Sequence, residues 1–167
     1  MRAQAVPDGQ AYGLQHLVAY GVAEARLGQT LGASGAVWSK IDAREPLAGF
    51  NESLLRLRRP RLELLQWHNW QAGLRDDPHF HSLWRALAED PRFVALGAST
   101  YGPDDALAAV ESGLFSVVQI EWNLLNQAAL RAAAPSARRR GVRLAARSIL
   151  LQGVLTERGA ELPSHLR

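Results

Sequence analysis

Residues 93–122 read FVALGASTYGPDDALAAVESGLFSVVQIEW, and their pattern indicates the class of fold. Its ends, 93–99 and 116–122, are apolar runs of strand length. Between them, Pro103-Asp104-Asp105 is a helix-start signal, and apolar residues follow it at helical spacing. A strand, a helix and a second strand in direct succession are typical of two parallel strands joined by a crossover helix.

The same unit recurs on both sides of this stretch. Further apolar runs of strand length occupy 36–41, 62–68 and 142–148, and a weaker one occupies 14–20. Counted from Val37, Leu62, Phe93, Ser116 and Val142, the five clear runs are 25, 31, 23 and 26 residues apart. Each step has the length of a strand plus its crossover helix, so the sequence predicts a parallel α/β sheet.

Helical periodicity fills the intervals between the strands. It predicts helices over 23–31 and 51–57, a helix after the capping pair Asp77-Pro78, and an alanine-rich helix over 127–140. Pro135 is expected to shorten or kink the last of these helices.

The length and composition indicate one domain. The chain has 167 residues, 47% hydrophobic content and a formal net charge of +3, the balance of 18 arginines and the single lysine, Lys40, against 16 acidic residues. We expect a single domain over 1–167, with an atypical N-terminal segment (1–13) and a C-terminal tail (156–167). Without cysteine, a signal peptide or an apolar run long enough to span a bilayer, the sequence predicts a cytoplasmic protein with no membrane contact.

Polar side chains stand where four of the predicted strands end. They are Lys40, His68, Ser99 and Gln119. In parallel α/β folds the carboxyl ends of the strands carry the active site, so we expect chemistry there.

The order of these residues and their neighbours resembles that of the aldo/keto reductases. The resemblance spans roughly residues 17–155 and rests on seven motifs in order: YGVAEARLG at 20–28, the strand lysine Lys40, SLLRL at 53–57, LLQWH at 64–68, LGAS at 96–99, VQIEWNLLN at 118–126 and ARSILLQGVL at 146–155. It implies an NADPH-dependent oxidoreductase on a (β/α)8 barrel of the TIM type. Such an enzyme moves a hydride between nicotinamide and a carbonyl or alcohol substrate.

The resemblance also implies catalytic roles for three residues. Tyr20 matches the general acid that protonates the carbonyl oxygen. A free phenol has a pKa of about 10, so a cation must lower it, and Lys40 matches the family's lysine for that task. His68 matches the histidine that orients and polarises the substrate carbonyl.

A second group matches the family's cofactor site. Ser99 and Thr100 match the pair that bonds the nicotinamide carboxamide, commonly Ser-Asn, so Thr100 is a departure. Gln119 matches the strand-end glutamine of the same site. Arg147, before Ser148, stands where many members carry an aromatic ring that stacks on the nicotinamide, and a guanidinium there would bias the redox state of the cofactor.

Two features of the family pattern are missing. The family carries an aspartate five residues before its tyrosine, but this position is Gln15. Without that carboxylate, desolvation should push Lys40 toward its neutral form. The length predicts about six to seven of eight βα units, a barrel incomplete at both ends and lacking the basic loops that grip the cofactor phosphates.

An incomplete barrel suggests an alternative function. Its two unpaired strand edges favour a homo-oligomer, so the chain is alternatively a catalytically inactive relative acting in self-association or protein interaction. The arginine runs at 56–61 and 138–140 fit solvated helix ends better than a nucleic-acid site.

Two smaller predictions concern side chains outside these motifs. His79 and His81 have no companion carboxylate at ligand spacing, so we expect no metal site. Trp70, just past His68, is a candidate to line a substrate pocket for apolar or aromatic carbonyl compounds.

Overall fold

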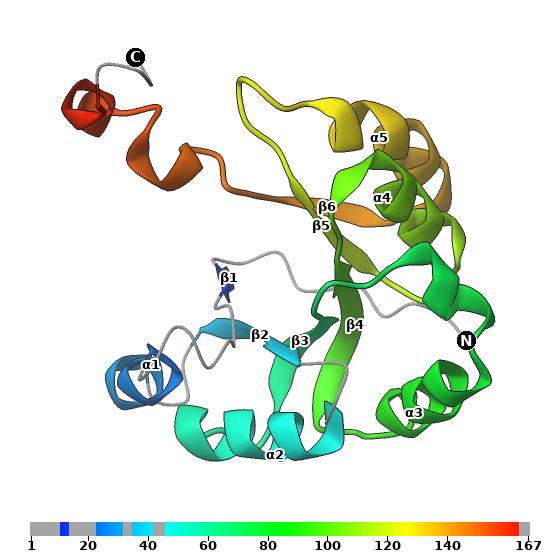
Figure 1. The fold of residues 1–167 in the computed structure, drawn as a ribbon. Coiled ribbons are helices and arrows are strands. Elements are labelled where there is room, and N and C mark those ends of the chain that lie inside the picture. Colours follow the sequence, from blue (N-terminus) through cyan, green and yellow to red (C-terminus); the bar gives the residue numbers. More distant parts are fainter. Residues whose placement is uncertain (1–10, 14–22, 32–34, 42–45, 164–167) are drawn as a thin grey trace.

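Six parallel strands form one sheet in the order β1-β2-β3-β4-β5-β6. The computed structural model describes residues 11–13, 23–31, 35–41 and 46–163. The strands are β1 (Ala11–Gly13), β2 (Ala36–Ile41), β3 (Leu62–Trp67), β4 (Phe93–Ser99), β5 (Val117–Glu121) and β6 (Arg143–Arg147). The sheet curls into part of a barrel, with the helices on its outer side (Figure 1).

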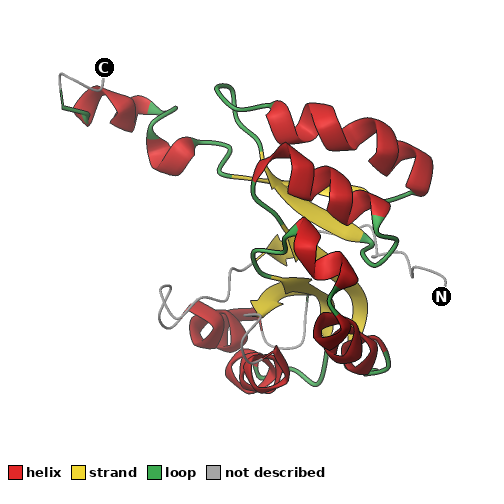
Figure 2. Cartoon of the chain, turned by 45° about the vertical axis from the view of Figure 1, so that its right-hand side comes forward, coloured by secondary structure: helices red, strands yellow, loops and turns green. Residues whose placement is uncertain are grey.

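The helices alternate with the strands along the chain. They are α1 (Ala23–Leu31), α2 (Pro46–Leu57), α3 (Pro78–Ala88), α4 (Gly102–Glu111) and α5 (Ala128–Arg140). A short 3-10 helix, η2 (Ala72–Asp76), precedes α3, and two more, η3 (Leu151–Gly153) and η4 (Glu157–Glu161), follow β6 away from the sheet (Figure 2). The predicted incomplete (β/α) barrel is confirmed.

Successive strand residues face opposite sides, which separates two apolar clusters. The outer cluster joins residues such as Ile41, Leu65 and Ile120 to the helices. The inner cluster consists of buried Leu64, Ala95 and Val117, with Trp38 and Ala145 packed against it. At the level of Leu64, Ala95 and Val117 the inner face is therefore apolar, as in a packed barrel interior.

Local signals in the sequence explain where the helices begin and how they pack. Asp77 caps α3, because its carboxylate accepts from the N–H groups of His79 at 2.7 Å and Phe80 at 3.3 Å. Gly28 permits α1 to approach the end of α2, since an added Cβ would lie 2.6 Å from the carbonyl oxygen of Arg56.

Three predicted elements differ from the structure. The helix predicted at 51–57 begins earlier, at Pro46, where proline suits the first turn. Pro135 does not shorten α5, which continues to Arg140: the proline is exposed, and Ala133 and Ala137 stay packed in the core. Strand β1 lies within the segment 1–13 that the sequence did not identify as strand, and the weak run at 14–20 lies outside the described residues.

Candidate functional site

Three predicted site residues form a hydrogen-bonded row on the inner face of the sheet. The Lys40 ammonium donates to Ser99 Oγ at 3.2 Å, and Ser99 Oγ donates to Gln119 Oε1 at 3.3 Å. Lys40 lies near the end of β2, Ser99 ends β4, and Gln119 is the register partner of Ser99 on β5. The row therefore runs along the carboxyl ends of the strands, where the sequence placed the site.

Lys40 is buried without a carboxylate partner among the described residues. Only 2% of the residue is exposed, and within that part of the chain its ammonium forms its hydrogen bond with Ser99. Burial, and after it the nearby positive charge of Arg147, lower the pKa of Lys40 from 10.5 to about 7. The predicted shift toward the neutral amine is confirmed, and near pH 7 the charged and neutral forms coexist.

Arg147, the last residue of β6, is held against the end of β4. Its Nη2 donates to the carbonyl oxygen of Thr100 at 3.1 Å, and its guanidinium carbon lies 4.2 Å from the centre of the Tyr101 ring. Its Nε is buried and has no hydrogen-bond partner among the described residues. Arg147 thus brings a permanent positive charge to the same end of the sheet as Lys40.

Thr100 is tied to the next strand. Its N–H donates to the carbonyl oxygen of Gln119 at 3.0 Å, and its hydroxyl donates to the same oxygen at 3.4 Å. Thr100 is 1% exposed. This threonine therefore fixes the junction of β4 and β5, while its carbonyl oxygen holds Arg147.

The remaining predicted site residues lie at the rim or outside the described residues. His68 directly follows β3, is half-buried, and donates its backbone N–H to the carbonyl oxygen of Ile41 at 3.0 Å. Ser148 is exposed and has a φ of 58°, in the left-handed region. Tyr20 and Gln15 lie outside the described residues.

Trp70 does not share this site. Its side chain is fully buried, and its ring packs edge-on against Phe115 in the outer core, with ring centres 5.5 Å apart. Trp70 belongs to the outer apolar cluster, whereas the row of Lys40, Ser99 and Gln119 lies on the inner face, so its contacts are those of core packing.

Two residues of the site were missed by the sequence reasoning. Tyr101 stacks under Arg147, and no pattern in the sequence indicates that contact. Gln66 is the register partner of Lys40, is 1% exposed, and has no acceptor for its Nε2 among the described residues. Its two-residue spacing from Leu64 on β3 and from His68 just after that strand was a signal that could have placed it on the inner face.

Charged residues outside the row serve the packing of the helices. Glu24 is buried and accepts hydrogen bonds from Ser39 Oγ at 2.7 Å and from Arg56 Nε at 2.8 Å. Arg59 is also buried, and its Nη1 lies 3.8 Å from a Glu63 carboxylate oxygen. The arginine run at 56–61 therefore contributes ion pairs to the fold.

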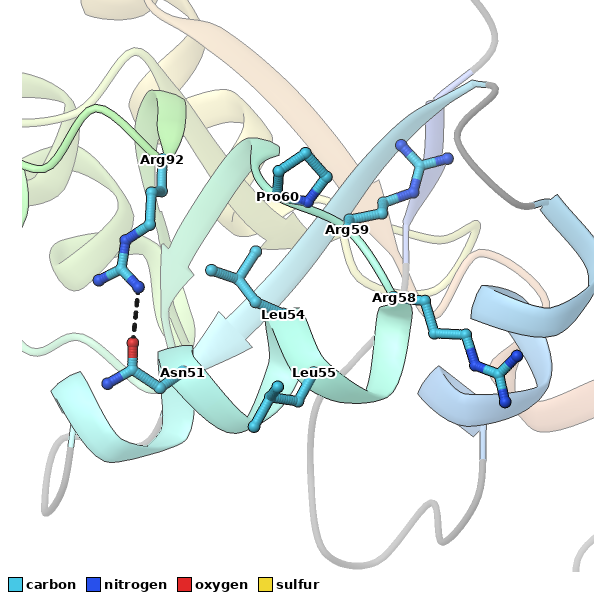
Figure 3. A pocket seen from close by; sticks show the side chains of 7 residues that line it. All are labelled: Asn51, Leu54, Leu55, Arg58, Arg59, Pro60 and Arg92. Carbon is cyan, nitrogen blue, oxygen red and sulfur yellow. Dashed lines mark hydrogen bonds between the residues drawn. The ribbon is translucent and has the colours of Figure 1, made fainter.

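A separate hollow of about 500 Å³ lies at the opposite end of the strands (Figure 3). It is lined by Asn51, Leu54, Leu55, Arg58, Arg59, Pro60 and Arg92. Arg92 is engaged there, because it donates to Asn51 at 2.8 Å and pairs with Asp90 at 2.6 Å. Active sites of such barrels lie at the other, carboxyl end of the strands.

The described residues hold neither a further metal-binding cluster nor a membrane-spanning helix. No cluster of three or more His, Asp or Glu side chains in the described ranges is placed to hold a metal ion. None of the helices that the structure describes has the length and apolar character needed to cross a bilayer.

The curled parallel sheet, with polar residues at its carboxyl end, defines a (β/α) barrel architecture of the kind found in many enzymes. Comparison with solved structures shows which proteins have a similar fold. The fold is similar to an aldo-keto reductase from Bacillus halodurans (TM-score 0.73, 19% identity), a glycerol dehydrogenase from Gluconobacter oxydans (0.71, 18%) and an aldo/keto reductase from Klebsiella pneumoniae in complex with NADP and acetate (0.73, 17%).

These similarities cover most of this chain and about half of each neighbour. The three alignments include 92%, 93% and 89% of this chain, and 54%, 54% and 56% of the respective neighbours. No protein-family profile and no curated protein sequence matches the chain. The chain therefore has the fold of part of an aldo-keto reductase barrel.

Proposed function

We propose that the chain is an NADP(H)-dependent oxidoreductase of the aldo/keto reductase type. It would transfer a hydride between the nicotinamide and a small carbonyl or alcohol substrate. The observation that carries this proposal is the hydrogen-bonded row of Lys40, Ser99 and Gln119 at the carboxyl ends of β2, β4 and β5. The fold of the solved reductases, one of them in complex with NADP, supports it.

The residues of the row fit the carboxamide of a nicotinamide. A carboxamide offers one oxygen acceptor and two N–H donors, and the Ser99 hydroxyl and the Gln119 amide can each donate and accept. Gln119 is only half-buried, so its amide can be reached from the inner face. Ser99, Thr100 and Gln119 would hold the carboxamide, with Arg147 and Ser148 beside them, and bound NADPH would supply the hydride.

The proton in this proposal comes from Tyr20. Its phenol would give a proton to the carbonyl oxygen, and a positive charge on Lys40 would make the phenol a stronger acid near neutral pH. Because the pKa of Lys40 is about 7, this help would weaken as the pH rises above 7. His68 would orient the substrate oxygen by donating a hydrogen bond.

Catalytic assay with a tyrosine variant tests the proposal. Purified chain is incubated with NADPH and a panel of small aldehydes and ketones, and the loss of absorbance at the dihydronicotinamide band is followed. We expect turnover by the wild-type chain and a loss of at least a hundredfold in Tyr20→Phe, with both proteins equally folded. Equal rates in the two proteins would remove Tyr20 from the mechanism.

The same chain could instead act in protein interaction, and one measurement separates the two functions. Both edges of the described sheet, β1 and β6, have one neighbouring strand each. An interaction protein that uses these edges would associate as its concentration rises and would ignore NADPH. Sedimentation velocity with and without NADPH distinguishes this behaviour from that of a cofactor-binding enzyme.

A further inference from the structure

Arg147 is fixed at the site by contacts on several sides. The Tyr101 ring covers one face of its guanidinium, the Thr100 carbonyl oxygen accepts from Nη2, and Ser148 Oγ lies 3.4 Å from Nη1. These contacts come from the end of β4 and from the segment after β6. The charge of Arg147 is therefore held in place before any ligand binds, which increases its effect on a bound charge.

Arg147 has no ion-pair partner among the described residues. Within the described ranges, no carboxylate lies within the 4.0 Å of an ion pair with either Arg147 or Lys40. Glu121, the register partner of Arg147 on β5, accepts a hydrogen bond from the neutral side chain of Asn123 at 3.3 Å, and no ion pair joins it to Arg147. The positive charge of Arg147 also lowers the pKa of Lys40.

We propose that Arg147 makes this site select the neutral, reduced nicotinamide over the positively charged, oxidised one. The inference rests on the proposed function, because it assumes that the carboxamide lies against Ser99 and Gln119. Arg147 is bonded to the carbonyl of Thr100, the residue that follows Ser99. A fixed cation there repels the oxidised ring and leaves the reduced ring unaffected, so the site binds NADPH in preference to NADP+.

The expected size of this selection follows from Coulomb's law. Two like charges several ångströms apart in a partly buried site are expected to lower the affinity by a factor of about 10 to 100, which corresponds to about 1.4 to 2.7 kcal/mol. An aromatic ring in the same place would have no such repulsion. The preference for NADPH over NADP+ therefore depends on this arginine, and replacing Arg147 should remove the preference without abolishing binding of the cofactor.

Dissociation constants of NADPH and NADP+ test the proposal directly. We expect wild-type chain to bind NADPH at least about tenfold more tightly than NADP+ at low salt, as measured by isothermal titration calorimetry. Arg147→Met retains an apolar contact for Tyr101 and removes the charge, and we expect it to bring the ratio of the two constants close to 1. Arg140→Met, at the exposed end of α5, is the matched control and should keep the wild-type ratio.

A second readout uses the protein without any nucleotide. Lys40 is the single lysine of the chain, so its side-chain resonance in a lysine-labelled sample is unique. Removing the charge of Arg147 should raise the pKa of Lys40, whereas Arg140→Met should leave it unchanged. An unaltered titration of Lys40 in Arg147→Met would show that the field of Arg147 does not reach the row, and would overturn the inference.

The outcomes separate this inference from the proposed function. If the wild-type chain binds both nucleotides equally, or if Arg147→Met keeps the wild-type ratio, the inference is wrong and the proposed function stands. If neither nucleotide binds to folded wild-type chain, both are wrong.

Discussion

The ammonium of Lys40 and the hydroxyl of Ser99 lie 3.2 Å apart, although their strands β2 and β4 are separated by β3. Residues on alternate strands of a flat sheet are about 10 Å apart. The long lysine side chain and the curl of the sheet close this distance over the inner face. The site thus depends on the barrel-like curvature as well as on the strand sequences.

Stability should rise with pH because of Lys40. Its pKa is about 7 in the folded chain and 10.5 as the ordinary value, so between these pH values the unfolded chain binds more protons. Stability is then lowest below pH 7 and increases as the pH rises toward 10.5, by up to about 5 kcal/mol. Urea unfolding at a series of pH values measures this slope.

The comparison variant for this experiment is Lys40→Met. It keeps a long apolar side chain and removes the amine, so the slope between pH 7 and 10 should become nearly flat. A wild-type slope retained in Lys40→Met would assign the pH dependence to other groups.

Glu24→Ala should destabilise the chain strongly. Glu24 is buried and accepts from both Ser39 and Arg56, so its removal leaves two donors without this partner and should cost about 3 kcal/mol. Glu52→Ala is the matched control, because Glu52 pairs with the same Arg56 but its side chain is 63% exposed. That variant should lose no more than about 0.5 kcal/mol, and equal losses in the two would contradict the account of this buried pair.

Gly28→Ala should disrupt the packing of α1 on α2. The new methyl group would lie 2.6 Å from the carbonyl oxygen of Arg56 and 2.7 Å from that of Leu57, both backbone atoms, so we expect a loss of about 3 kcal/mol. Gly49→Ala within α2 meets only a side-chain methyl of Ile41 at 3.9 Å and should gain up to about 1 kcal/mol. Thermal unfolding of both variants gives the comparison.

Gln15→Asp should raise the pKa of Lys40. The family resemblance places an aspartate at position 15, and a carboxylate near the ammonium favours its charged form. Titration of the single lysine by NMR measures the change, with Gln15→Glu as a second acidic variant. An unchanged pKa of Lys40 in both variants would show that a carboxylate at position 15 does not act on the Lys40 ammonium.

Much of the fold could be predicted from periodicity, because the spacing of apolar residues along the chain indicates each strand and helix separately. The bounds of β2 and β4 match the apolar runs, and Asp77 caps α3 as its sequence indicates. Strand β1 could not be predicted, because its three residues show no pattern and its pairing depends on β2. The continuation of α5 through Pro135 depends on packing in the core, which periodicity does not report.

The residues that form the site could be predicted from the sequence, but the contacts between them could not. Lys40, Ser99 and Gln119 lie together because the ends of parallel strands share one edge of the sheet, which the sequence anticipates. The stacking of Arg147 on Tyr101 depends on the path of the loop after β4, and no periodic signal describes that path. The burial of Trp70 likewise depends on its tertiary contact with Phe115.

The most direct test of the central claim is the melting temperature of the purified chain with and without saturating NADPH. Binding to the folded state at 100 times the dissociation constant stabilises it by about 2.7 kcal/mol, which corresponds to several degrees. We predict a cooperative transition that NADPH raises by several degrees, with a smaller rise in Gln119→Leu. A cooperative transition that NADPH does not move would contradict the proposal that this end of the sheet binds the cofactor.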